Sequence, residues 1–159
     1  MKSKAINVPY VNNQSAYVLI IAWLVLIFLF SNQSAPESSL LSSTIVNNIA
    51  PVAPVIIKSS LTFMVRKSAH IFLYFVLGIF AAKLLASYKL KSKFVYVYGL
   101  MTIFAYAVTD EIHQLFVTGR SGEVRDVLID TIAGALGIAL YLGLRRLYGT
   151  SKKTKNIVQ

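Results

Sequence analysis

Four apolar stretches are the feature that most constrains how this chain can fold. They cover residues 16–30, 61–87, 94–116 and 127–148, and 56% of the 159 residues are hydrophobic. A helix needs about 20 apolar residues to cross a hydrocarbon core about 30 Å thick. The last three stretches reach that length, and the first is somewhat shorter. The sequence therefore predicts an all-α, polytopic protein with four transmembrane helices, in which residues 16–148 form one membrane domain.

The positive charges are arranged along the chain in a way that predicts the orientation of these helices. The net charge is +10, which would also suit a nucleic-acid binder. The lysines and arginines, however, precede the first stretch, separate the second from the third and follow the fourth: Lys2, Lys4, Lys89, Lys91, Lys93, Arg145, Arg146, Lys152, Lys153 and Lys155. Cytoplasmic loops carry such an excess. We therefore expect a multi-pass protein of the cell membrane with a cytoplasmic segment at residues 1–15, a basic cytoplasmic tail at 149–159, and no nucleic-acid partner.

The segment after the first stretch has the signature of a short interfacial helix. Ser34 and Glu37 have the spacing of a capping box, and Pro51 and Pro54 end the pattern. Between them, leucine and isoleucine recur at helical spacing opposite a face of serines. This predicts an amphipathic helix on the outer surface between the first two spans. A solvated loop is the alternative, and a signal peptide is the alternative for the first stretch.

Small residues recur along the fourth stretch and predict close helix packing. Ala133 and Gly137 are four residues apart, and so are Ala135, Ala139 and Gly143. Small side chains at this spacing allow two helix backbones to approach closely.

Ionisable and polar side chains interrupt the last three stretches, where the cost of burial makes them candidates for function. On each predicted helix we expect them to share a face: Lys67, His70 and Tyr74; Asp110, His113 and Gln114, with Glu111 beside them; and Asp126 and Asp130. With a rise of about 1.5 Å per residue, His70, Asp110 and Asp130 all lie roughly 22–25 Å from the cytoplasmic ends of their helices. Three helices thus bring polar groups to one depth, which predicts a pocket near the outer headgroups. The alternative is an ion-pair network that only locks the helices together.

The loop before the last stretch contains two glycines, Gly119 and Gly122, together with Arg120 and Arg125. Guanidinium groups bind carboxylates and phosphates with paired hydrogen bonds. We expect this loop to help bind an anionic headgroup or acidic ligand, unless both arginines only pair with neighbouring acids.

The same residues leave metal binding and catalysis open. The chain has no cysteine, and its histidines and carboxylates do not follow a recognisable metal motif. No cofactor is predicted, although a divalent metal remains open. The candidates for acid–base catalysis are His70, Asp110, Glu111, His113 and Asp126. No nucleophile stands out, so the sequence does not decide whether the protein is an enzyme.

Three motifs give the chain a resemblance to a known family. They are FSNQ at residues 30–33, RKSAHIFLYFVLG at 66–78 and TDEIHQLFVTGRSGEVRDVLID at 109–130, and Gly134 and Gly137 agree as well. The chain resembles the VanZ-like family over roughly residues 30–145. Thr118 departs from the pattern, since the family often has proline before the Gly-Arg pair, and the departure affects only the turn. The resemblance implies an integral membrane protein of Gram-positive bacteria linked to resistance against teicoplanin and other lipoglycopeptides.

Three kinds of function fit these observations. The first is a binding protein whose outer pocket takes up an anionic lipid, a lipid-linked envelope precursor or a lipoglycopeptide, with His70, Asp110, Arg120 and their neighbours as its ligands. The second is a membrane-embedded hydrolase or transferase that acts on a lipid-linked envelope substrate. The third is a structural role in which the polar network holds helices around a partner.

Overall fold

The computed structural model describes residues 13–155, which form helices joined by short connections. The helices are α1 (Asn13–Ser31), α2 (Ala35–Ile49), α3 (Val55–Ser87), α4 (Ser92–Gln114) and α5 (Val124–Lys155). Three of them, within α3, α4 and α5, are long and apolar enough to cross a membrane. The pair α1 and α2 passes the same test together but is bent by 100° between the two helices. The chain is therefore an all-α membrane protein with three candidate spans, or four if the bent pair is included.

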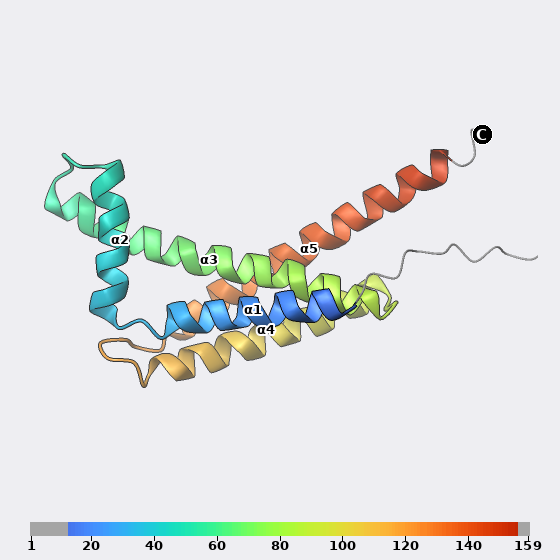
Figure 1. Ribbon diagram of the computed structural model, residues 1–159, viewed down its shortest axis with the longest axis horizontal. Helices are drawn as coiled ribbons and strands as arrows, with labels where there is room; N and C mark the ends of the chain where they lie inside the picture. Colours follow the sequence, from blue (N-terminus) through green and yellow to red (C-terminus); the bar gives the residue numbers. More distant parts are fainter. Residues whose placement is uncertain (1–12, 156–159) are drawn as a thin grey trace, which may run out of the picture.

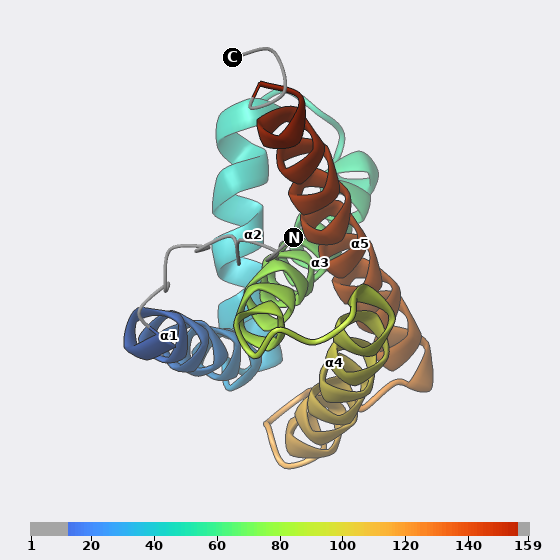
Figure 2. The ribbon, with the colours of Figure 1, turned by 90° about the vertical axis from the view of Figure 1, so that its right-hand side faces the viewer.

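The helices form a bundle that is closed at one end by a crossing helix. Helices α1, α3 and α4 run side by side along the long axis, whereas α2 lies across the end of the bundle (Figure 1). Helix α5 packs against both α3 and α4, and its C-terminal part extends beyond the other helices (Figures 1 and 2). The connection from α4 to α5 lies at the same end as α2, and the basic connection from α3 to α4 lies at the opposite end (Figure 1).

The predicted helix after the first apolar stretch is confirmed, and its orientation is informative. Ser34 caps α2, accepting a hydrogen bond from the Glu37 backbone, and the Glu37 carboxylate accepts one from the Ser34 backbone at 2.9 Å. Ser38 and Ser42 are buried, whereas the leucines and isoleucines of the other face are exposed. Small serines thus allow α2 to lie close to α3, and the apolar face of α2 points away from the protein.

Some helix boundaries differ from the prediction. Helix α3 starts at Val55 rather than at residue 61. Pro54 supplies the helix start, and the turns of α3 that precede residue 61 pack against α2. At about 1.5 Å per residue, its 33 residues are about 50 Å long, more than a hydrocarbon core requires. Helix α5 continues to Lys155, so much of the predicted tail is helical. Most of the predicted N-terminal segment, residues 1–12, lies outside the described residues.

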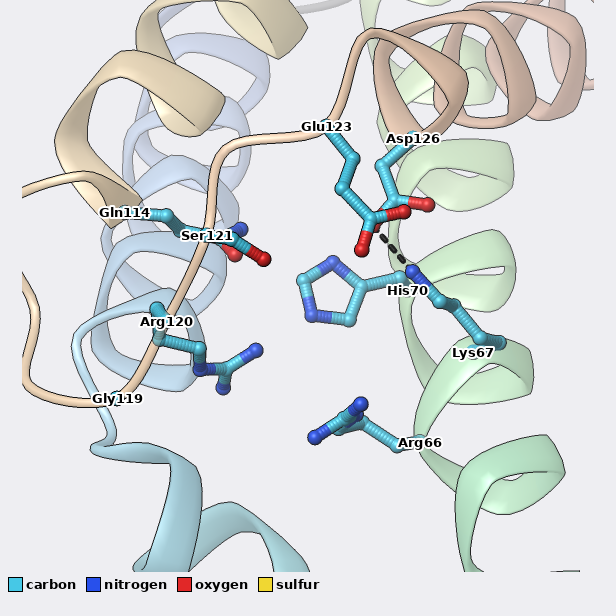
Figure 3. A pocket seen from close by; sticks show the side chains of 9 residues that line it. All are labelled: Arg66, Lys67, His70, Gln114, Gly119, Arg120, Ser121, Glu123 and Asp126. Atoms are coloured by element: carbon cyan, nitrogen blue, oxygen red, sulfur yellow. Dashed lines mark hydrogen bonds and ion pairs between the residues drawn. The ribbon is translucent and has the colours of Figure 1, made fainter. Parts of the chain in front are cut away.

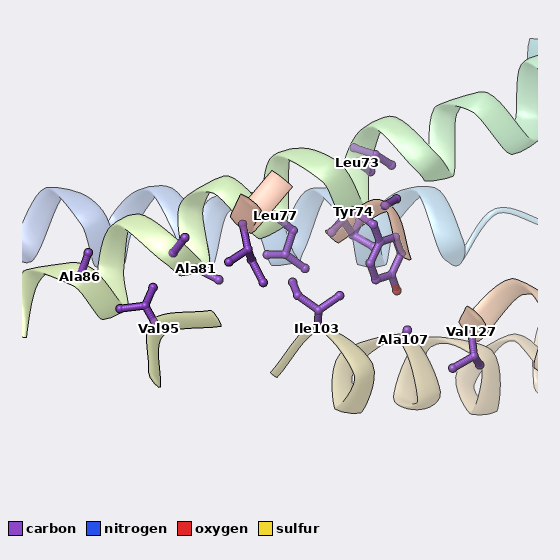
Figure 4. Packing of buried hydrophobic residues seen from close by; sticks show 13 residues of the cluster. Leu73, Tyr74, Leu77, Ala81, Ala86, Val95, Ile103, Ala107 and Val127 are labelled. Carbon is purple, nitrogen blue, oxygen red and sulfur yellow. The ribbon is translucent and has the colours of Figure 1, made fainter. Parts of the chain in front are cut away.

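The core of the bundle depends on a close contact between α3 and α5. A Cβ atom added to Gly137 would lie 2.0 Å from the carbonyl oxygen of Phe75, and one added to Gly78 would lie 2.1 Å from that of Gly134. Buried Tyr74, Leu77 and Ile103 pack nearby (Figure 4). The close approach predicted for Ala133 and Gly137 is therefore confirmed. Within the described residues, no atom lies within 4 Å of a Cβ added to Gly143, so that part of the second small-residue pattern makes no helix contact.

Two hydrogen bonds attach α1 to the bundle. The Trp23 indole donates to the carbonyl oxygen of Leu73 on α3 at 2.8 Å. The Tyr106 hydroxyl of α4 donates to the carbonyl oxygen of Leu24, also at 2.8 Å. Both acceptors lie on apolar segments where unpaired polar groups are costly. These contacts hold α1 alongside α3 and α4.

Candidate functional site

The polar end of the bundle is organised by the loop between α4 and α5. The backbone N–H of Ala35 donates to the carbonyl oxygen of Thr118 at 3.2 Å, and Arg120 Nε donates to the carbonyl oxygen of Gln33 at 3.1 Å. The loop is thereby fixed to the turn between α1 and α2. Gly119 has a φ of 73°, a left-handed conformation that glycine adopts without strain.

Glu111 holds the other half of this loop. Its carboxylate accepts one hydrogen bond from the backbone N–H of Glu123 at 2.8 Å and another from the Gln114 side chain at 3.2 Å. A Cβ atom on Gly122 would come within 2.7 Å of the carbonyl oxygen of Glu111, so a glycine is needed at this close approach. Glu111, a sequence candidate for the site, thus anchors the loop that covers the site.

A polar cavity of about 70 Å³ lies beneath the loop, between α3, α4 and the start of α5. Figure 3 shows the His70 ring in the middle of it, between Arg120 on one side and Asp126 and Lys67 on the other. The cavity is lined by Arg66, Lys67, His70, Gln114, Gly119, Arg120, Ser121, Glu123 and Asp126. Five of these residues were sequence candidates. The spacing could have identified Arg66 too, because it precedes His70 by four residues and so lies on the same helix face.

Some of the charged groups around the cavity form ion pairs with each other, and others lack a partner of opposite charge among the described residues. Lys67 forms an ion pair with Asp126, and exposed Arg125 forms one with Glu123 at 2.8 Å. Arg125 therefore pairs with a neighbouring acid, which was the alternative to ligand binding. Arg66 and Arg120, in contrast, have no carboxylate within 4.0 Å in the part of the chain that the structure describes.

Arg120 is the group most in need of a partner. One terminal nitrogen of its guanidinium is buried and has no hydrogen-bond acceptor among the described residues. Burial and the nearby Arg66 guanidinium lower the pKa of Arg120. A guanidinium nevertheless stays charged in proteins. The cavity thus presents a fixed positive charge with an unused donor.

A second layer of polar side chains lies deeper, next to His70. The Nδ1 atom of His70 is 4.0 Å from Oδ2 of Asp130, and the Tyr74 hydroxyl donates to Oδ2 of Asp110 at 3.2 Å. Asp110 and Asp130 are buried. One ligating atom each from His70, Asp110 and Asp130 lies within 4.8 Å of the others. The structure therefore brings together the side chains from three helices that the sequence placed at one level.

His113 is not part of this arrangement. Its Nε2 atom lies 3.2 Å from the Asn32 side-chain oxygen, and its ring lies against that of Phe28, with 4.8 Å between the centroids and an angle of 34° between the planes. The expectation that it shares the inward face of Asp110 and Gln114 is wrong. Each residue turns a helix by about 100°, so His113 points towards α1 while Gln114 points towards the cavity.

An apolar groove adjoins the polar cavity. It has a volume of about 520 Å³ and runs between α2 and the first turns of α3, lined by Pro36, Ser39, Leu40, Ser43, Ser59, Thr62, Phe63 and Arg66. Arg66 borders both the groove and the cavity, and its guanidinium lies over the Phe63 ring. The sequence did not indicate this groove.

Comparison with known proteins agrees with the motifs. The model of the family described as VanZ/LLP1 matches residues 16–146, which include all five helices in part or in full. Neither the comparison with curated proteins nor that with solved structures finds a match. The family match covers most of the chain and every residue of the cavity and groove. The chain therefore belongs to the VanZ/LLP1 family.

Proposed function

We propose that this protein binds an anionic lipid or lipid-linked envelope precursor in an extracytoplasmic pocket, and that it thereby contributes to teicoplanin and lipoglycopeptide resistance. The observation that carries the proposal is the pair of guanidinium groups, Arg66 and Arg120, without carboxylate partners among residues 13–155. Phosphate and carboxylate oxygens accept paired hydrogen bonds from such groups. An anionic ligand is therefore the natural partner of the cavity.

The groove favours a lipid over a water-soluble anion. Arg66 forms part of both the polar cavity and the apolar groove, so one molecule can contact both sites. Its anionic group would lie beside Arg66 and Arg120, and its hydrocarbon chain would follow Leu40 and Phe63 between α2 and α3. The exposed apolar face of α2 would lie against the membrane, so a lipid can reach the groove from the bilayer.

The size of the cavity favours a headgroup over the antibiotic. Sites for drug-sized molecules have volumes of about 300–1,000 Å³, whereas the polar cavity measures about 70 Å³. A single phosphate or carboxylate group fits this scale. Resistance would then arise because the protein changes which anionic molecules are accessible at the outer surface.

Lipid binding by the purified protein tests this proposal. We expect native mass spectrometry in detergent to show dioleoyl phosphatidylglycerol bound in preference to dioleoyl phosphatidylcholine. Removal of one charge-assisted hydrogen bond costs about 1.5–3 kcal/mol, so Arg120→Gln and Arg66→Gln should each weaken binding of the anionic lipid roughly 10-fold to 150-fold. Arg125→Gln is the matched control, because Arg125 is exposed and already paired with Glu123. Equal losses in all three variants would contradict the proposal.

The cellular role has a separate test. We expect Arg120→Gln to increase teicoplanin susceptibility at unchanged protein abundance, whereas Arg125→Gln should leave susceptibility unchanged. If abundance falls in step with resistance, the residue is needed for folding and the structural interpretation is correct.

The proposed site requires a defined topology, with four spans and both termini in the cytoplasm. The alignment of α1 with α3 and α4, and the perpendicular course of α2, support a first span followed by an interfacial helix (Figure 1). Ser121 and Ser92 are both exposed. Ser92 is the first residue of α4, and Ser121 lies in the loop that follows the other end of this helix. A cysteine at Ser121 should react with an impermeant thiol reagent from outside, and one at Ser92 should not. The reverse labelling would invert the topology.

A lipid-modifying enzyme is a second candidate, because His70 lines the cavity and its Nδ1 atom is 4.0 Å from Oδ2 of Asp130. A histidine beside a buried carboxylate is a common acid–base arrangement, and its hydrogen bond can shorten on substrate binding. Mass spectrometry of lipids from cells with the native protein and with His70→Gln separates the candidates. An enzyme changes the covalent mass of a lipid, and a binding protein does not.

A further inference from the structure

His70, Asp110 and Asp130 present one nitrogen and two oxygen ligands from three different helices. Their ligating atoms lie within 4.8 Å of one another, and His70 Nδ1 is 4.0 Å from Asp130 Oδ2. In a tetrahedral zinc site with bonds of about 2.0–2.2 Å, neighbouring ligand atoms are roughly 3.3–3.6 Å apart. A shift of about 1 Å in these side chains would complete that geometry, which is within the reach of small rotamer adjustments.

One carboxylate oxygen of this cluster lacks a hydrogen-bond partner among the described residues. The Asp130 side chain has only 3% of its surface exposed, and its Oδ2 atom has no hydrogen-bond partner there. Asp110 receives a hydrogen bond from the Tyr74 hydroxyl, and Lys67 is already paired with Asp126. A buried carboxylate oxygen that is left unpaired is unfavourable in a membrane protein.

We propose that His70, Asp110 and Asp130 form a binding site for a divalent transition-metal ion, with Zn²⁺ as the best match. A doubly charged ion balances both carboxylates and satisfies the free oxygen of Asp130. Imidazole combined with carboxylate ligands suits zinc and similar metals, whereas Mg²⁺ prefers oxygen ligands alone. Tyr74 fits the role of an outer group, since hydrogen bonds to ligating carboxylates orient them.

The site would leave one coordination position open towards the cavity. His70 both belongs to the cluster and lines the cavity beneath Arg66 and Arg120. Three protein ligands and an open position are the arrangement of zinc sites that bind an external ligand. The metal site does not depend on the identity of the anion, because its three ligands would bind the ion in either case.

Metal titration of the full-length protein tests the inference. The protein is purified in detergent, treated with a chelator and titrated with Zn²⁺ by calorimetry, with Mg²⁺ in parallel. Co²⁺ absorption provides a second measurement of coordination. We expect one equivalent of Zn²⁺ to bind and Mg²⁺ to bind far more weakly. Asp130→Asn, Asp110→Asn and His70→Gln should each weaken Zn²⁺ binding at least tenfold, and Tyr74→Phe roughly tenfold.

The control is His113→Gln, because this second histidine points towards α1 and should leave the affinity unchanged. Size-exclusion chromatography shows which variants remain folded. If one ligand variant does not fold, the other ligand variants still test the site. Absence of stoichiometric Zn²⁺ binding by the native protein would overturn the inference. Equal binding by native protein and folded Asp130→Asn would also overturn it. Lipid binding measured in chelator, with Arg120→Gln as the comparison, tests the proposed function separately.

Discussion

Replacement of Gly137 by alanine is expected to disturb the contact between α3 and α5 that positions the polar cluster. The added Cβ would lie 2.0 Å from the carbonyl oxygen of Phe75, and an ordinary contact begins at 3.4 Å. The obstacle is helix backbone, which cannot rotate away as a side chain can. The two helices must therefore separate by about 1.4 Å or tilt, with loss of dispersion contacts along the interface.

Such overpacking costs about 1–3 kcal/mol, and replacing a helical glycine by alanine returns about 1 kcal/mol, so the net loss is up to about 2 kcal/mol. For a chain of this size, 1 kcal/mol shifts Tm by about 2–4 °C. We expect Gly137→Ala to lower Tm by up to roughly 8 °C, measured by circular dichroism during heating in detergent.

Gly143→Ala is the matched control on the same helix. Among the described residues, nothing lies within 4 Å of its added Cβ, so this variant should be as stable as the native protein or slightly more stable. If Gly137→Ala and Gly143→Ala melt at the same temperature, the tight contact between α3 and α5 does not contribute to stability as argued.

Three further predictions concern the polar contacts. Lys67→Met should destabilise the protein by about 3–5 kcal/mol, because the mostly buried Asp126 carboxylate loses its cation. In chemical denaturation, the double variant with Asp126→Asn should recover much of this loss. Hydrogen bonds from the Ser34 side chain and backbone hold the pKa of Glu37 below its usual value of 4.5. The capping box should therefore stabilise α2 fully above pH 4.5 and lose its contribution as the pH falls through the lowered pKa. The protection of backbone amides against hydrogen exchange at the start of α2 should thus fall at low pH in the native protein but show no such change in Glu37→Gln. Tyr106→Phe should lower the free energy of unfolding by about 1 kcal/mol and increase hydrogen exchange in α1, because the Leu24 carbonyl loses its donor on α4. Unchanged exchange would mean that this hydrogen bond does not hold α1.

The helical elements were largely predictable because they depend on local features. The length of an apolar stretch determines whether its helix can cross a bilayer, and Ser34 with Glu37 specifies where α2 begins without reference to any distant residue. The common level of the polar groups was predictable as well, because the rise of a helix is constant. This is why His70, Asp110 and Asp130 could be expected at one level before their contacts were known.

The pairing of side chains could not be obtained in this way, because it depends on the rotation and tilt of each helix against its neighbours. Arg120 and Arg125 look equivalent in the sequence. Among residues 13–155, however, Arg125 has a carboxylate partner, whereas Arg120 has none and keeps a buried donor without an acceptor. His70 and His113 differ in the same sense, since one lines the cavity and the other faces α1. The sequence by itself determined which helices form and that polar groups of three helices lie at one level. Only the tertiary structure decided which groups meet, because contacts between helices depend on residues far apart in the chain.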